Sequence, residues 1–344
     1  MSASTVDAVR EAVAASGLFA RDRPLVAMLS GGRDSTCLLD VAVALLGAPA
    51  VCALHVNYGL RVEAADEESR CRELCERLGA ELRVVVAEPA LAPGRPEAGD
   101  AGDPGAAGNL QAWARELRYT EAEGLATERD ALIATGHTAT DQVETILYRL
   151  AASPGRRALL GMAAAEGRLI RPLLALGRDQ TAAYCEARDL SFAEDASNSD
   201  LRYARARVRH EVLPALREVH PAAERNVLRT AALLREETEL LDALVEAELE
   251  GPPTRGAVEL ARLREMPPAL ARMVVVRLAE QATHSYVPQA GERVAELLEL
   301  ARRGGRAELH VGGRAGAVLE DGRLRMVRLP PRGAGESEPG QGAL

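Results

Sequence analysis

The sequence contains no lysine, so all 42 of its basic residues are arginines. This absence excludes the Walker A P-loop and the kinase ATP site, because both place a lysine beside the nucleotide phosphates. Aromatic residues are also scarce, with two Phe, six Tyr and one Trp. An extended platform for stacking nucleic-acid bases is therefore disfavoured as well.

The five cysteines include no CxxC pair, and an odd number without regular spacing is typical of reduced thiols. Cys71 and Cys75 form a CxxxC pair, which we interpret as two buried structural residues on one helix face. No uninterrupted apolar run approaches the ~20 residues that cross a bilayer. The start of the chain carries acids and lacks a signal-peptide pattern. We expect a cytoplasmic globular protein without a membrane partner.

The net charge of −9 hides a strong asymmetry along the chain. Residues 1–200 carry a net charge of −10, whereas residues 201–235 carry +5 and residues 251–330 carry +4. Between these two basic segments, residues 236–250 hold seven acids and no base. A polyanion would therefore be attracted to the middle and C-terminal segments and not to the whole molecule.

Short apolar runs alternate with helical patterns in the first half of the chain. The strand candidates are residues 25–29, 50–56, 82–87 and 131–135, and the helix candidates are residues 36–46, 63–78, 110–125 and 140–150. Strands that alternate with helices predict an α/β fold with a doubly wound parallel sheet. Residues 93–108 are rich in Pro, Gly, Ala and Asp, which is typical of a mobile loop.

The second half of the chain differs from the first half in its sequence pattern and composition. Residues 199–250 are helical in pattern and rich in arginine, with Pro214 and Pro221 as expected breaks between helices. After a linker around residues 251–256, we expect a small α+β domain that ends in two or three strands. The expected domains are therefore residues 1–198, 199–250 and 257–329, followed by a disordered tail over residues 330–344.

A glycine turn follows the first expected strand and precedes a helix. It consists of Ser30, Gly31, Gly32, Arg33, Asp34 and Ser35. Glycines let the backbone approach an anion closely, and the helix that follows offers free N–H groups and the positive end of its dipole. Asp34 is the natural place for a Mg²⁺ ion that screens phosphates. The alternative is a tight turn whose Ser or Asp caps a helix.

This turn resembles the PP-loop of the N-type ATP pyrophosphatases, whose pattern is Ser-Gly-Gly-x-Asp-Ser. Six further segments resemble those of one member family, the tRNA(Ile)-lysidine synthetases, and occur in that family's order. They are LHVNYGLR at 54–61, WARELRY at 113–119, ATGHTATDQVETILYRL at 134–150, LLGM at 159–162, RPLL at 171–174 and DASNSDLRYARARVRHEVLP at 195–214. The resemblance covers about residues 25–235 and implies a PP-loop, Rossmann-like N-terminal domain.

The resemblance implies a ligase that uses ATP and Mg²⁺ and acts on a tRNA. In this family, ATP adenylates the wobble cytidine (position 34) of the CAU anticodon of tRNA(Ile), and pyrophosphate leaves. The ε-amine of free L-lysine then attacks C2 of that cytidine and displaces AMP, which gives lysidine. The implied partners are tRNA(Ile) and L-lysine. The oligomeric state stays open, with a homodimer as one option.

The same resemblance implies roles for individual residues. Residues 30–35 would bind the ATP phosphates, and Asp34 would bind Mg²⁺. His137 would act near the adenylation step, while Asp141 and Glu144 would hold the cationic amine of lysine. Arg115 would face the phosphate or the activated intermediate, since a fixed guanidinium suits developing phosphoryl charge. Its alternative is a surface arginine in a helical salt bridge.

The spacing of His137, Asp141 and Glu144 agrees with such a site. Residues four and three apart share one face of a helix, and Thr138 or Thr140 is a good N-cap before it. The histidine would then lie beside the carboxyl end of a strand, where such sheets bind ligands. The alternative for these three residues is a polar helix face exposed to water.

A second basic block holds Arg202, Arg205, Arg207 and Arg209 around a tyrosine. If this segment is helical, the arginines spread around its circumference, which suits a segment inserted against an RNA backbone. The resemblance places the block near the opening of the active site and implies that it contacts tRNA. A solvated basic helix is the alternative.

The sequence departs from the family pattern at Tyr58, Ala206, Ser153 and Ala158, and none of these departures removes a proposed catalytic group. Other functions stay open. A thiolation enzyme of the same superfamily needs CxxC pairs, and an amidation enzyme needs an ammonia-generating domain. A third alternative is a regulator that binds ATP or RNA without catalysis.

Overall fold

The structure is a computed structural model, and it divides the chain into two compact units, residues 1–234 and 235–344. It describes residues 2–20, 22–59, 64–87, 104–152, 155–193, 204–249 and 256–330. Residues 93–103 of the expected loop and residues 331–344 of the expected tail lie outside these ranges, whereas residues 104–108 belong to a helix (Pro104–Arg129), so the expected loop is wrong for them. The expected boundaries at residues 198 and 250 lie outside them too, so the three-domain division stays a prediction.

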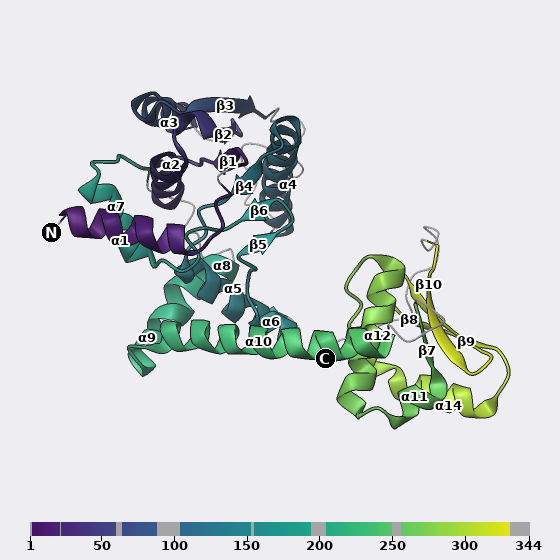
Figure 1. Cartoon of the computed structure of the whole chain (residues 1–344). Helices are drawn as coiled ribbons and strands as arrows, with labels where there is room; N and C mark the ends of the chain where they lie inside the picture. Colours follow the sequence, from purple (N-terminus) through teal and green to yellow (C-terminus); the bar gives the residue numbers. More distant parts are fainter. Residues whose placement is uncertain are drawn as a thin grey trace. The chain divides into compact units, whose positions relative to one another are not determined.

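The first unit is built on one six-stranded sheet (Figure 1). Its strands are β1 (Leu25–Met28), β2 (Val51–Asn57), β3 (Glu81–Val86), β4 (Leu132–Ala134), β5 (Ala165–Glu166) and β6 (Leu169–Ile170). The order is β3-β2-β1-β4-β6-β5, and all neighbours are parallel except β5 and β6. The expected doubly wound parallel sheet is confirmed.

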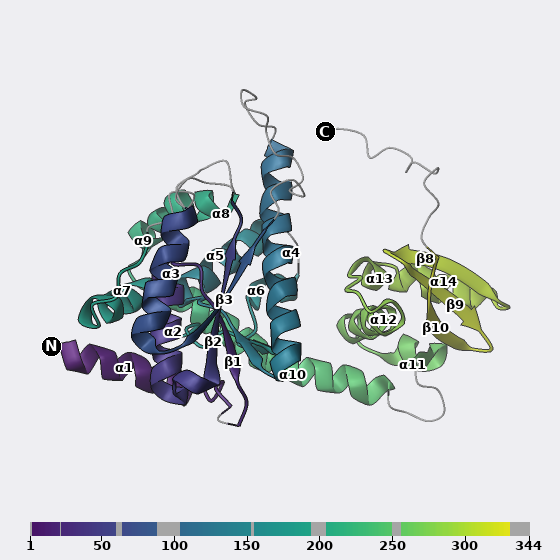
Figure 2. The ribbon, with the colours of Figure 1, turned by 90° about the horizontal axis from the view of Figure 1, so that it is seen from above.

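Helices cover both faces of this sheet. They are α1 (Ser2–Ala15), α2 (Arg33–Leu46), α3 (Ala64–Leu78), α4 (Pro104–Arg129), α5 (Ala139–Ala152), α6 (Arg156–Leu159) and α7 (Arg178–Ala187). Figure 2 shows α1, α2, α3 and α7 on one side of the sheet and α4 on the other. The fold therefore has three layers in its first unit.

The sequence of β1 explains how one strand serves both layers. Side chains alternate between the faces of a strand, and Leu25 and Ala27 join the core under α1, α2, α3 and α7. Val26 and Met28 join the core under α4. Because both faces are covered, the strand is apolar throughout, as expected for a parallel sheet.

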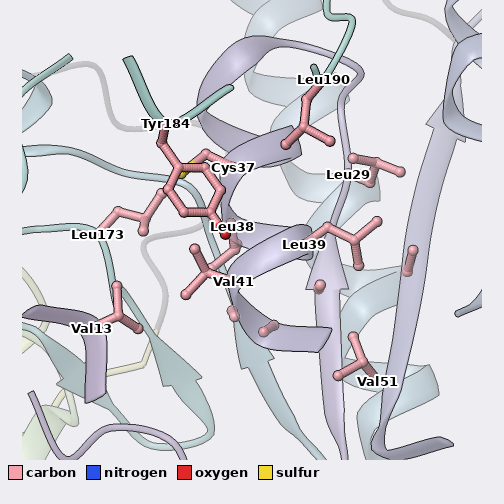
Figure 3. Packing of buried hydrophobic residues seen from close by; sticks show 14 of the residues in the cluster. Val13, Leu29, Cys37, Leu38, Leu39, Val41, Val51, Leu173, Tyr184 and Leu190 are labelled. Carbon is pink, nitrogen blue, oxygen red and sulfur yellow. The ribbon is translucent and has the colours of Figure 1, made fainter. Parts of the chain in front are cut away.

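The larger of these two cores contains a buried charge. Asp40 on α2 is 1% exposed, and its carboxylate accepts hydrogen bonds from Tyr184 of α7 (2.5 Å) and Arg188 (3.1 and 3.0 Å). Burial alone would raise the pKa of Asp40, but the hydrogen bonds from Arg188 and Tyr184 bring it below its usual range. Figure 3 shows the Tyr184 ring among Cys37, Leu38 and Leu173. The carboxylate thus fixes α7 against α2.

Residues 204–219 form a nearly continuous helix made of α8 (Ala204–Arg207), a π-helical segment (Val208–Val212) and α9 (Leu213–Val219). The break expected at Pro214 is therefore wrong. Pro214 lies in the first turn of α9, directly after the π-helical segment. The break at Pro221 is confirmed, since α9 ends at Val219 and α10 (Ala223–Leu249) begins after it.

The second unit combines an antiparallel sheet with short helices. Its strands are β7 (Ala257–Glu259), β8 (Ala307–Gly312), β9 (Ala315–Glu320) and β10 (Arg323–Arg328), in the order β7-β10-β9-β8. Its helices are α11 (Leu260–Glu265), α12 (Pro268–Thr283), α13 (Gln289–Glu292) and α14 (Val294–Arg303). The expected small α+β fold is confirmed for residues 256–330. None of the described helices of the chain is long and apolar enough to cross a membrane.

We predict that Asp40→Ala lowers the free energy of unfolding by about 3–5 kcal/mol, because it leaves buried hydrogen-bond donors and a cation without their partner. Urea unfolding followed by circular dichroism measures the change. Asp7→Ala, which alters an exposed acid on α1, is the matched control and should change stability by less than about 0.5 kcal/mol. Equal stabilities of the two variants would contradict this role of Asp40.

Candidate functional site

The candidate site lies where the carboxyl ends of β1 and β4 meet. Within the sheet, β2 and β3 lie on one side of β1, and β4 lies on its other side. The loops after β1 and β4 therefore diverge at the topological switch point, where sheets of this type bind ligands. The loop after β1 holds the glycine turn and leads into α2, and the loop after β4 holds His137 and leads into α5.

The glycine turn has the geometry of an anion cradle. Gly31 has a φ of 80°, a value that favours glycine. The Ser35 hydroxyl accepts a hydrogen bond from the Ser30 N–H (3.2 Å), lies 3.0 Å from the Ser30 hydroxyl and donates to the Gly32 carbonyl (2.8 Å). Gly32 is the N-cap of α2, so the N–H groups of its first turn point out of the helix without intrahelical partners. Such N–H groups can receive phosphate oxygens.

Gly136 brings the second loop against this cradle. A Cβ atom at this position would lie 2.9–3.0 Å from backbone atoms of Asp34 and Ser35, closer than side chains tolerate. Only glycine therefore lets the loop after β4 reach the start of α2. The sequence analysis did not identify this residue, although its place in a Thr-Gly-His turn after a strand was a usable signal.

Asp34 is the second residue of α2, and its side chain is 17% exposed. Its Oδ1 atom accepts hydrogen bonds from the Thr181 hydroxyl (2.6 Å) and from Nε of Arg33 (3.2 Å). Its Oδ2 atom lies 3.7 Å from Nε of Arg178 and accepts no hydrogen bond from the described residues. One accessible carboxylate beside a phosphate cradle fits Mg²⁺, which proteins bind through one or two carboxylates and substrate phosphates. In the described ranges, no three His, Cys, Asp or Glu side chains form a metal cluster.

His137 lies in the loop before α5 and is held by a second buried hydroxyl. Its Nδ1 atom is 2.8 Å from the hydroxyl of Thr135. The pKa of His137 is lowered from 6.5 to about 4, mainly by burial; Arg205, Arg171 and Arg115 add to this effect, and the charge of Asp141 opposes it. The imidazole is therefore neutral at pH 7 and carries one N–H and one lone pair.

Asp141 completes the start of α5. Its Oδ2 atom accepts hydrogen bonds from the N–H (2.9 Å) and the hydroxyl (2.8 Å) of Thr138, which makes Thr138 the N-cap. Burial alone would raise the pKa of Asp141, but the guanidinium of Arg178, 3.3 Å from Oδ1, and the Thr138 hydrogen bonds lower it. This carboxylate is charged, buried and part of the helix cap.

Glu144 lies one turn further along α5 and is fully buried. Arg209 contacts both of its oxygens, at 2.6 and 2.9 Å, and Arg205 contacts Oε2 at 3.1 Å. Both arginines also reach Oδ1 of Asp141, at 3.4 and 3.3 Å. The structure thus brings two members of the basic block onto the two acids. Arg207 is exposed, and Arg202 lies outside the described residues.

Arg115 lies on α4 and is exposed. Its guanidinium lies over the ring of Tyr119, 4.6 Å from the centroid, which is a cation–π contact. Tyr58, at the end of β2, fixes the same part of α4: its hydroxyl donates to the carbonyl of Ala114 (2.9 Å), and its ring packs edge-on against Trp113. The departure from the family pattern at Tyr58 therefore has a structural role beside Arg115.

The other departures have simpler places. Ala206 is buried in α8, and Ala158 is buried in α6. Both positions hold a small side chain in a packed environment. Ser153 lies outside the described residues.

An open cavity of about 790 Å³ lies beside Arg178 and Arg209. The charged side chains that line it are Arg33, Arg178, Asp179, Arg209, Arg217, Glu224 and Arg225. The beginnings of α5 and α7 also line it, at Thr140 and Gly177. Five arginines against two acids make this opening attractive to anions.

Sequence reasoning missed four contributors to this site: Thr135, Gly136, Arg178 and Thr181. Arg178 and Thr181 belong to α7, which follows the RPLL segment. The sequence does not predict that this helix contacts the glycine turn. Thr181 is 147 residues from Asp34 along the chain. An isolated threonine in a helix gives no signal for such a contact.

We predict a pH-dependent contribution of His137 to stability. The unfolded state binds a proton near pH 6.5 and the folded state only near pH 4, so acid favours unfolding between these values. From pH 7 to pH 5, the free energy of unfolding of the wild type should fall by about 2 kcal/mol more than that of His137→Asn. Urea unfolding at both pH values measures this, and parallel losses in the two proteins would contradict it.

Comparison with known proteins agrees with this geometry. The chain matches the PP-loop domain family over residues 4–216. It is 38% identical to a tRNA(Ile)-lysidine synthase of Geobacter sulfurreducens over 72% of the chain and 52% of that protein. It is 38% identical to that of Thermus thermophilus over 90% of the chain and 57% of that protein. It is 36% identical to that of Mycolicibacterium paratuberculosis over 77% of each.

The chain thus spans about half the length of the first two relatives. Among solved structures, the U34-tRNA thiolase NcsA from Methanococcus maripaludis, with its [4Fe-4S] cluster, has a TM-score of 0.54 at 17% identity. That match covers 67% of this chain and 79% of the thiolase, and it shows a common fold. The glycine turn, the switch-point loops and the sequence relatives agree, and the chain belongs to the PP-loop family and, within it, to the tRNA(Ile)-lysidine synthases.

Proposed function

We propose that this protein ligates L-lysine to C2 of the wobble cytidine in the CAU anticodon of tRNA(Ile), at the expense of ATP. The products are lysidine, AMP and pyrophosphate. One observation carries the proposal: in a chain of this family, a lysine-free glycine turn meets the loop with His137, which leads into the helix with Asp141 and Glu144, at the β1–β4 switch point. The two substrates of a ligase need such neighbouring sites.

The first step is adenylation. The C2 carbonyl oxygen of the cytidine attacks the α-phosphorus of ATP, a bond from that oxygen to phosphorus forms, and pyrophosphate leaves. The N–H groups of the glycine turn would hold the phosphates, with the hydroxyls of Ser30 and Ser35 beside them. Neutral His137, next to the cradle, can hydrogen-bond the reacting groups. Exposed Arg115 offers a cation to the developing charge.

Asp34 would hold Mg²⁺ through its Oδ2 atom, which accepts no hydrogen bond from the described residues. When bound, the ion screens the negative charge that builds up as the phosphate bond breaks. Arg33 and Arg178 lie on either side of this carboxylate and add fixed positive charge. The chain itself thus supplies cations where most phosphate-binding loops use lysine.

The second step is attack by the lysine amine. Its lone pair forms the bond to C2, the bond from C2 to the bridging oxygen breaks, AMP leaves with that oxygen, and the attacking nitrogen releases one proton to solvent. Asp141 and Glu144 would hold an ammonium of lysine through their carboxylates. In the structure these acids pair with Arg205 and Arg209. The lysine ammonium therefore has to take the place of a guanidinium, which would leave that arginine available to the tRNA backbone.

The tRNA would approach from the arginine-rich side of the first unit. Arg207 is exposed, and Arg217 and Arg225 line the cavity beside Arg178. Arginine contacts to phosphates supply affinity that does not depend on base sequence. We propose residues 199–250 as a tRNA-contacting domain, together with Arg202, and residues 257–329 as a further grip on the tRNA. As a tRNA-modifying enzyme, the protein would work in the cytoplasm.

The thiolation alternative is disfavoured by the cysteines. All five are buried free thiols. Burial raises the pKa of both Cys71 and Cys75 to about 12, so neither is a thiolate ready to ligate an iron–sulfur cluster or carry a persulfide. The alternative of an inactive regulator is disfavoured because the described site keeps every acidic group and the histidine that the reaction needs.

The test is incorporation of radiolabelled lysine into a tRNA that carries CAU, with ATP and Mg²⁺. We predict incorporation into this tRNA and none into a control tRNA with another wobble base. Asp34→Ala should abolish it, because the metal–phosphate site loses its carboxylate. ATP turnover without lysine incorporation would support another nucleophile, and absence of ATP turnover would support the regulator.

We further predict that Glu144→Gln raises the KM for lysine at least tenfold while the KM for ATP changes less than twofold. The reason is that a charge-assisted contact of about 1.5–3 kcal/mol is lost at the amine site only. Steady-state kinetics with each substrate varied in turn measures both constants. Asp179→Asn, which changes an acid at the cavity rim, is the matched control. Equal effects on both KM values would contradict the assignment of Glu144 to lysine.

A further inference from the structure

One face of α7 and the residue just beyond the helix contact α2 along much of its length. Thr181 donates to Asp34 at the beginning of α2, the Cys185 thiol lies 3.7 Å from the carbonyl of Arg33, and Tyr184 and Arg188 hold Asp40 two turns further on. Three of these contacts involve charges or buried polar atoms. Such contacts lock the two helices into one register.

Thr181 makes the contact that matters most for the site. The residue is fully buried, and its hydroxyl lies 2.6 Å from Oδ1 of Asp34 and 3.0 Å from the carbonyl of Arg178. A hydroxyl has a single proton, and a carboxylate is a stronger acceptor than a carbonyl. The short distance to Asp34 therefore assigns the proton to that bond.

Two guanidinium groups compete for the same carboxylate. Nε of Arg33 lies 3.2 Å from Oδ1, and Nε of Arg178 lies 3.7 Å from Oδ2. Arginine forms bidentate pairs with carboxylates, which would occupy both oxygens of Asp34. The Thr181 bond holds Oδ1 toward α7, and Oδ2 accepts no hydrogen bond from the residues the structure describes.

The helix that carries Thr181 is itself fixed. Tyr184 is fully buried, and its hydroxyl donates to Asp40 and accepts from Arg10 of α1. Arg188 closes the other side of the same carboxylate. Because α7 is held at this end, the hydroxyl of Thr181 reaches Asp34 without a rearrangement of the helix.

We propose that Thr181 is a positioning residue: its hydroxyl fixes the Asp34 carboxylate so that Oδ2 stays available to the magnesium–nucleotide complex. This inference rests on the proposed function in one respect, that Asp34 serves bound metal and nucleotide. It adds a requirement for a hydroxyl at residue 181. Loss of the hydroxyl would let Arg33 or Arg178 capture the carboxylate.

The test compares Thr181→Val, which keeps the shape of the side chain, with Thr181→Ser, which keeps the hydroxyl. Thr283→Val is the matched control, because Thr283 is also a buried helical threonine, whose hydroxyl donates to a backbone carbonyl of the second unit. Calorimetry measures binding of a non-hydrolysable ATP analogue with and without Mg²⁺. Thermal unfolding of the free proteins reports on structure.

We expect Thr181→Val to weaken analogue binding in Mg²⁺ roughly tenfold, the effect of one lost hydrogen bond to a charged group. Without Mg²⁺, its binding should match that of the wild type. Thr181→Ser should bind like the wild type in Mg²⁺, and Thr283→Val should lose stability without losing affinity. Unchanged affinity of Thr181→Val in Mg²⁺ would overturn the inference, as would equal losses with and without Mg²⁺ or failure of Thr181→Ser to restore binding.

This experiment separates the inference from the proposed function, since it uses neither tRNA nor lysine. Magnesium-dependent binding that Thr181→Val weakens supports the positioning role even if no lysidine forms. The positioning role is overturned if the protein forms lysidine but its binding of the analogue depends neither on the hydroxyl of residue 181 nor on Mg²⁺. In that case the proposed reaction still stands.

Discussion

Two buried carboxylates on one helix can be tolerated only if cations reach them, and the first unit depends on that constraint. Asp141 and Glu144 lie inside the protein, where an unpaired charge is strongly unfavourable. Arg178 of α7 and Arg205 and Arg209 of residues 204–219 supply the partners. The same ion pairs therefore fix three separate segments of the chain around the end of β4.

This arrangement gives the site its chemical character. Arginine cannot lose its proton, so the positive charge around the acids does not vary with pH. His137, half-buried and close to that charge, is kept neutral near pH 7. The proposed lysine ammonium would have to replace one of these arginines, which would link the proposed amine site to the cations proposed to meet the tRNA.

Much of the fold could be predicted because it depends on local patterns. The alternation of short apolar runs with helical patterns predicts the parallel sheet, and the glycine turn between the strand and helix of residues 25–46 predicts a phosphate cradle. The Thr138 cap and the spacing of Asp141 and Glu144 placed these acids at the start of a helix, as the structure has them. The helix break predicted at Pro214 is wrong because a proline in a first helical turn and a proline between helices cannot be told apart in the sequence.

The partners of the site residues could not be predicted, because they come from distant segments. The family resemblance implies a tRNA-facing role for all four arginines of the basic block, whereas Arg205 and Arg209 contact acids more than 60 residues away along the chain. The hydroxyl of Thr181 is equally remote from Asp34. The packing of α7 on α2, fixed by Asp40, shows why Thr181 and Asp34 meet.

We propose that the protein adenylates a cytidine before lysine attacks it. This order can be tested by incubating the protein with CAU-bearing tRNA, Mg²⁺ and ATP labelled at its α-phosphate, without lysine. We expect label that is bound covalently to the tRNA and is released as AMP when lysine is added. Label that never enters the tRNA, while lysine is still incorporated, would contradict it.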